Sequence, residues 1–184
     1  LLDYYLDLSV KAQYHSYEVM NQHVSFLFTS LLTDDCIARG KALLDGGVRY
    51  LGGTNETYGN INTSDSLWVI RDLVFNQKKY TLRQLNDAML ANFNGYEALR
   101  KECLNCDKYG NDLETADTMA NDLYEFVAKG VRDRGIAIGM QYFLIVISNN
   151  QLNTEWGNRT AASPDGRLSC MYMNLSLIHI SEPT

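Results

Sequence analysis

Cys103 and Cys106 stand three residues apart, a spacing that suggests chemistry within this 184-residue chain. A Cys-x-x-Cys pair works as a redox dithiol where a helix N-terminus lowers the thiol pKa, or as half of a zinc site. Here the pair falls late in an expected short helix, and the sequence has no second Cys-x-x-Cys to complete four zinc ligands. We therefore favour a structural role and keep metal binding through Cys103 and Cys106 as the alternative.

A glycine-rich segment, residues 46–59, is the second candidate, because glycines let backbone amides approach an anion such as a phosphate. Neither the P-loop spacing nor the dinucleotide-binding Gly-x-Gly-x-x-Gly spacing occurs in it. The segment is better explained as a long structural loop, with a short strand at residues 48–51.

Two histidines, His15 and His23, lie eight residues apart, but no nucleophile motif or metal spacing accompanies them. Asp34 and Asp35 are adjacent, and adjacent side chains on a helix point apart, so they do not form an acid–base pair. No single residue therefore makes a catalytic case by its own chemistry.

The spacing of apolar residues predicts a helix-rich chain. Helices are expected over residues 1–23, 26–40, 96–106 and 116–134, and two more from residues 62 and 81. In the helix from residue 62, Leu67, Ile70, Leu73 and Val74 should share the inward face, and Asp65 should lie at the positive N-terminal end.

Thr81 and Gln84 should form a capping box at the start of the next helix, and Leu82, Leu85 and Met89 should face inward. The β-branched and aromatic run from Tyr142 is typical of a strand buried on both faces. Helices that lead into such a strand indicate an α/β fold.

Composition excludes several classes of protein. With 46% hydrophobic and 21% charged residues the chain is globular, and a net charge of −6 without a basic cluster argues against nucleic-acid binding. No apolar run approaches the roughly 20 residues of a membrane-spanning helix. Four cysteines form no secreted framework and no leader segment is recognised, so we expect a reduced, cytoplasmic protein.

The last ten residues, 175–184, follow no pattern set by the preceding chain. They match the translation of a transposase-type sequencing adapter codon for codon, so we expect a non-native tail there. Residues 1–174 are then the native part of the chain.

Six motif segments occur in the order found in one family: residues 30–40, 46–50, 62–67, 91–100, 108–112 and 159–167. Together they resemble the pyruvate formate-lyase-like domain of the glycyl radical enzymes. The resemblance implies an α/β fold in which a ten-stranded barrel is wrapped by helices, and this chain would be a helix-rich slice of that barrel.

The resemblance also implies thiyl-radical chemistry on a small organic substrate, of the formate acetyltransferase or dehydratase kind. In the family, one loop carries a catalytic cysteine in a Gly-Cys-Val-Glu setting. A second loop carries a glycyl radical, installed by a partner iron–sulfur activase that uses S-adenosylmethionine. The 184 residues contain neither loop, which would lie before Leu1 and after the native part. We therefore expect the chain to bind no cofactor and to be inactive alone, within a parent enzyme that is a homodimer.

Substrate contact is expected only from the end of the strand that starts at Tyr142. Its polar residues Ser148, Asn149 and Asn150 would lie where the family builds its pocket, although polar residues that end a strand are an equal explanation. The alternative to the enzyme hypothesis is a non-catalytic helical binding module.

Overall fold

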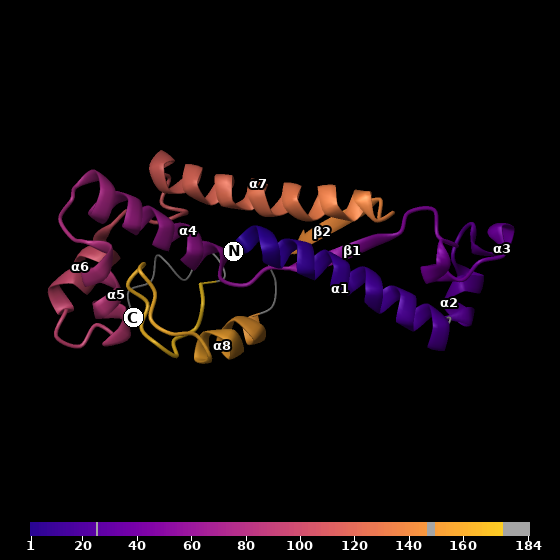
Figure 1. The fold of residues 1–184 in the computed structure, drawn as a ribbon, viewed down its shortest axis with the longest axis horizontal. Helices are drawn as coiled ribbons and strands as arrows, with labels where there is room; N and C mark the ends of the chain where they lie inside the picture. The colour runs from indigo at the N-terminus through magenta and orange to yellow at the C-terminus, as the bar shows by residue number, and fades with distance from the viewer. Residues whose placement is uncertain (25, 147–149, 175–184) are drawn as a thin grey trace. The chain divides into compact units, whose positions relative to one another are not determined.

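The structure, a computed structural model, describes residues 1–24, 26–146 and 150–174 (Figure 1). Its helices and strands follow one another in this order: α1 (Leu2–His23), α2 (Leu27–Leu32), α3 (Cys36–Arg39), the 3-10 turn η1 (Leu43–Asp45), β1 (Gly52–Glu56), α4 (Asn60–Val69), the π-helical η2 (Ile70–Asn76), α5 (Leu82–Leu90), α6 (Glu97–Asn105), α7 (Glu114–Ala137), β2 (Tyr142–Val146) and α8 (Asn150–Asn158).

These elements form two compact units. The first unit combines Leu1–Glu56 with Phe126–Val146, and the second combines Thr57–Glu125 with the chain that follows β2. Helix α7 contributes to both units.

In the first unit, β1 and β2 pair in parallel and in register from Gly52 opposite Tyr142 onward. Helix α1 lies beside the strands (Figure 1), where the Tyr17 hydroxyl donates to the Gly52 carbonyl at 3.0 Å. The Gln13 side-chain oxygen accepts from the Thr54 amide at 3.2 Å. Parallel strands joined through helices are characteristic of α/β proteins, so the expected fold class is confirmed at that level.

The Phe143 ring of β2 lies against two glycines. A Cβ atom on Gly53 of β1 or on Gly135 of α7 would come within 2.5 Å of this ring. Such a distance is far inside van der Waals contact, so both positions need a residue without a side chain.

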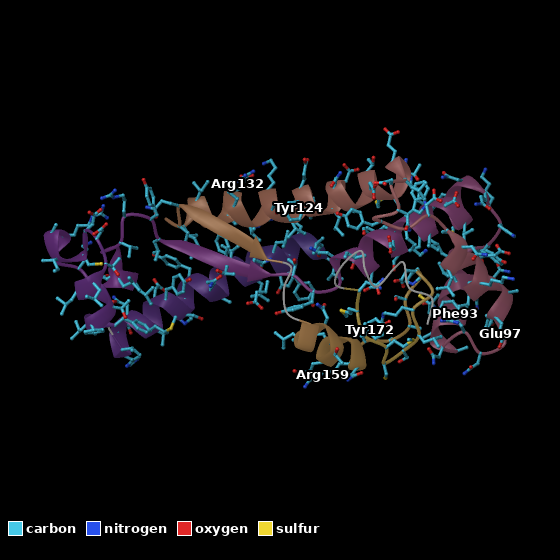
Figure 2. The ribbon with its side chains drawn as sticks, turned by 180° about the vertical axis from the view of Figure 1, so that it is seen from behind. Phe93, Glu97, Tyr124, Arg132, Arg159 and Tyr172 are labelled. Atoms are coloured by element: carbon cyan, nitrogen blue, oxygen red, sulfur yellow. The ribbon has the colours of Figure 1, made fainter. Side chains whose placement is uncertain are left out.

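In the second unit, η2, α5 and α6 surround an apolar core. Its buried residues are Val69, Leu73, Leu85, Ala88, Phe93, Leu99 and Cys103. Figure 2 labels Phe93, which lies in the turn between α5 and α6, near Glu97 at the start of α6. The predicted capping box at the start of α5 is confirmed, because the Thr81 hydroxyl accepts from the Gln84 amide and the Gln84 side chain accepts from the Thr81 amide.

Several local predictions were wrong. The strand expected at residues 48–51 lies at Gly52–Glu56 instead. Leu67 is 41% exposed, because α4 begins at Asn60 and continues into η2, whose wider turn shifts the apolar face. Leu82 is also exposed. The strand expected from Tyr142 onward ends at Val146.

None of the helices formed by the described residues combines the length and apolar character needed to cross a membrane.

The seat of Phe143 generates a stability prediction. Replacing a helical glycine with alanine ordinarily stabilises a helix by about 1 kcal/mol. We expect Gly135→Ala to lower the free energy of unfolding by roughly 1–3 kcal/mol instead, because the new methyl group overlaps the Phe143 ring. Urea unfolding of the single variant and of Gly135→Ala/Phe143→Leu measures the effect. If the smaller side chain at position 143 recovers none of the loss, the overlap is not its cause.

Candidate functional site

The second unit contains a cluster of buried polar side chains that joins α4 to the turn of residues 163–167. Asn62, Asp65 and Ser66 lie on one face of α4, because residues three and four apart are neighbours on a helix surface. All three are buried, as are Asp165 and Arg167. Buried polar residues must find partners, so this face specifies what packs against it.

Asp165 is the centre of this cluster. One carboxylate oxygen accepts from the Asn62 side-chain amide at 2.6 Å, and the other accepts from the Ser163 hydroxyl at 2.5 Å and the Arg167 amide at 3.3 Å. Its own amide donates to the Ser66 hydroxyl at 3.3 Å. The carboxylate is thus surrounded by donors from α4 and from its own turn, as a buried negative charge requires.

Arg167 holds the turn from the opposite side by donating to backbone carbonyls. Its guanidinium donates to the Leu168 carbonyl at 3.2 Å and to the Met171 carbonyl at 2.8 Å, and it also bonds the Ala161 carbonyl. Burial lowers the pKa of this guanidinium, because removal from water disfavours the charged form.

Asp65 fixes a third segment. One of its carboxylate oxygens accepts from the Tyr109 amide at 2.9 Å, which attaches residues 108–112 to α4. The second oxygen, Oδ2, is buried and makes no hydrogen bond within the described part of the chain. Burial raises the pKa of Asp65 to about 6; Tyr109 and Lys108 oppose the rise, while Asp165 and Asp117 add to it. The expectation that Asp65 lies at the positive end of its helix was therefore wrong, because α4 begins five residues earlier at Asn60.

Two further contacts bring residues 91–100 to the same place. The Arg100 guanidinium donates from Nε to the Gly166 carbonyl at 2.9 Å. The Asn92 side-chain oxygen accepts from the Ser169 amide at 2.8 Å. Four motif segments that are scattered in the sequence, residues 62–67, 91–100, 108–112 and 159–167, thus meet around α4.

The remaining two motif segments meet in the first unit. Arg49 donates to both carboxylate oxygens of Asp35, at 3.0 and 3.2 Å, and Arg39 donates to Asp35 at 3.3 Å. The pKa of Asp35 is lowered chiefly by its hydrogen bonds to Arg49. This ion pair is largely exposed, so it positions residues 46–50 more than it stabilises them.

The cysteine pair lacks the properties of a reactive site. Cys103 is fully buried at the end of α6, and burial raises its pKa to about 12, with Cys106 adding to the rise. Burial raises the pKa of Cys106 too. Metal binding and redox chemistry both use the thiolate. Within the residues that the structure describes, no group of three or more His, Cys, Asp or Glu side chains could hold a metal ion.

The predicted substrate residues are only partly placed. Ser148 and Asn149 lie outside the described residues. Asn150 begins α8 and so belongs to a helix instead of the expected strand end. Substrate contact by these three residues stays a prediction.

Sequence reasoning missed the polar cluster as a set. The available signal was three polar residues, Asn62, Asp65 and Ser66, at helical spacing. No signal in the sequence said that this face would meet Asp165, because the two segments are separated by about a hundred residues.

The geometry of Asp165 predicts the effect of an isosteric change. In Asp165→Asn the new amide group must face either the Asn62 side-chain amide or the Arg167 amide, so two donors meet. We expect the free energy of unfolding to fall by about 2 kcal/mol. Urea denaturation checks this against Asp87→Asn, a matched change at an exposed site on α5. Equal midpoints for the two variants would contradict the role given to Asp165.

The raised pKa of Asp65 predicts a pH effect of definite sign. A folded pKa near 6 lies above the unfolded value, so the folded state binds more protons between about pH 4 and 6 and the stability contribution of Asp65 is lost as pH rises through this window. We expect Asp65→Asn to gain stability relative to the wild type between pH 4 and pH 7.5, by at most about 3 kcal/mol. Denaturation at both pH values, with Asp87→Asn as control, measures the difference. A constant difference across this range would show that Asp65 is not destabilised by burial.

Comparison with known proteins places this geometry in a family. The family model for pyruvate formate lyase-like proteins matches residues 1–152. A probable dehydratase, YbiW of Escherichia coli K12, is 32% identical over 174 residues, which cover 89% of this chain and 21% of that protein. Trans-4-hydroxy-L-proline dehydratase of Clostridioides difficile is 31% identical over 91% of this chain and 21% of its own length.

Solved structures agree with these matches. Hydroxyproline dehydratase from Clostridioides difficile superposes with a TM-score of 0.87 and 30% identity, covering 95% of this chain and 22% of that one. A structure that describes 1,2-propanediol dehydration in Roseburia inulinivorans gives a TM-score of 0.85 and 29% identity, with coverage of 94% and 22%. The chain spans about one fifth of the length of these relatives. It belongs to the pyruvate formate lyase-like family of glycyl radical enzymes.

Proposed function

We propose that this chain is an internal segment of a glycyl radical lyase that acts on a small organic substrate through a thiyl radical. The observation that carries the proposal is the family match over residues 1–152 combined with coverage of about one fifth of each relative. The named relatives include dehydratases, a 4-hydroxyphenylacetate decarboxylase glycyl radical subunit and isethionate sulfite-lyase. These names favour a lyase over the acyl transfer of a formate acetyltransferase.

The role of this segment is to hold the fold, since it contains neither the catalytic cysteine loop nor the glycyl radical loop of the family. Its motif residues support this role. Asn62, Asp165 and Arg167 are occupied with one another or with backbone groups, which suits residues that fix geometry. A radical enzyme needs such rigidity, because a carbon radical must be kept from solvent and from side reactions.

The parent protein would be activated by a partner iron–sulfur enzyme that uses S-adenosylmethionine, and would work as a cytoplasmic homodimer. Ser148, Asn149 and Asn150 remain the proposed substrate contacts of this segment. The competing hypothesis of a metal-binding module through Cys103 and Cys106 finds no support in the buried, thiol-favouring surroundings of this pair.

Anaerobic activation tests the proposal. The 184-residue chain and the longer polypeptide encoded by its gene are each incubated with a radical-generating activase, S-adenosylmethionine and a reductant. We expect a glycyl radical signal in electron paramagnetic resonance from the longer polypeptide and none from the chain alone. A radical on the 184-residue chain would overturn its role as a supporting segment.

Substrate class is tested on the activated longer polypeptide. Trans-4-hydroxy-L-proline, 1,2-propanediol and isethionate are supplied as lyase substrates, and pyruvate with coenzyme A as the acyl-transfer control. Turnover of a lyase substrate supports the proposal, whereas turnover of pyruvate alone would assign the transferase reaction instead.

A further inference from the structure

A cavity of about 240 Å³ opens beside the buried polar cluster of the second unit. The residues that matter for its chemistry are Asp65, Arg100, Lys108, Asp165 and Arg167, and Tyr172 (labelled in Figure 2) also lines it. With three cationic and two carboxylate side chains, the lining carries a net positive charge. Such a lining favours an anion over a cation.

Two of these side chains are already occupied. Both carboxylate oxygens of Asp165 accept hydrogen bonds from Asn62, Ser163 and the Arg167 amide. The Arg167 guanidinium is occupied by backbone carbonyls and the Ser163 hydroxyl. Neither is free to select a ligand.

The other three side chains keep unused hydrogen-bonding capacity. Asp65 is 1% exposed, and its Oδ2 has no partner within the described part of the chain. Arg100 uses Nε on the Gly166 carbonyl, which leaves its two terminal nitrogens without a partner among the described residues. Lys108 donates to the Cys103 carbonyl at 2.6 Å and has further ammonium protons.

One acceptor facing the same cavity as two cationic donors defines the ligand. We propose that this cavity binds a protonated oxyanion, of which hydrogen phosphate is the example, through an O–H donated to Asp65 Oδ2. Its remaining oxygens accept from Arg100 and Lys108. An oxyanion without a proton would set its lone pairs against those of Asp65, and a buried acceptor without a donor destabilises the complex.

This site does not depend on the radical chemistry proposed above, since it uses side chains that the glycyl radical mechanism does not require. It also explains why Asp65 is retained as a buried carboxyl with an unpaired oxygen. A ligand that supplies the missing donor removes part of the penalty of burying that oxygen.

Calorimetric titration of the 184-residue chain at pH 8 tests the proposal with three probes. Inorganic phosphate keeps one O–H at this pH, whereas sulfate and glycerol 3-phosphate keep none on their oxyanion. We expect saturable phosphate binding, and at least about tenfold weaker binding of the other two. Binding of phosphate but not of the ester assigns the free ion, while equal binding of all three, or no binding, would overturn the proposal.

Two pairs of variants locate the effect. Asp65→Asn offers an amide donor to the anion, so the preference for phosphate over sulfate should disappear, whereas exposed Asp87→Asn should keep it. Arg100→Gln should weaken phosphate binding by about tenfold, because it removes the terminal nitrogens. Lys101→Gln, the same charge change at the next, exposed position of α6, should leave the affinity unchanged.

Circular dichroism of each variant confirms that the fold is kept. If Asp65→Asn does not fold, the comparison of Arg100→Gln with Lys101→Gln decides the question by itself. Equal affinities of these two variants would show that phosphate binds elsewhere.

Discussion

The second unit depends on the need to surround one buried carboxylate, that of Asp165, with hydrogen-bond donors. An isolated buried charge is destabilising by several kcal/mol, roughly the whole stability of a small domain. The donors come from Asn62 on α4, from Ser163 and from the Arg167 amide. Because these groups are far apart in the chain, satisfying one carboxylate fixes where the turn of residues 163–167 packs. Arg167 and Asp65 then hold the next segments to that fixed point.

The two units join their motif segments by different means. In the first unit, Asp35 collects Arg39 and Arg49 at a largely exposed position, where water competes with every contact. In the second unit, the corresponding contacts are buried, so a lost partner leaves an unsatisfied group with no water to replace it. Motif residues can therefore be functionally essential in such a protein without touching a substrate. The observation that six motif segments pair among themselves supports a role in holding geometry.

Local chemistry was predictable from the sequence, and long-range chemistry was not. The capping box of Thr81 and Gln84 and the long helix α7 follow from residues a few positions apart, and both were found. Leu67 was misplaced because η2 widens the helix, which no periodicity shows. Asp65 was taken for an exposed helix-end residue, since its burial depends on Tyr109 and on the turn at Asp165. The family motifs named these segments but not their contacts.

Exposed apolar side chains in the first unit bear on the size of the working protein. Leu27, Phe28, Leu31 and Leu32 on α2, with Ile37 on α3, are each more than 60% exposed. Monomeric proteins rarely leave several large apolar residues together in water. A chain that spans about one fifth of its relatives would meet the rest of a parent polypeptide along such surfaces. The contrast with the second unit, whose polar groups are mostly satisfied internally, implies that α2 and α3 depend more on chain outside this segment for their stability.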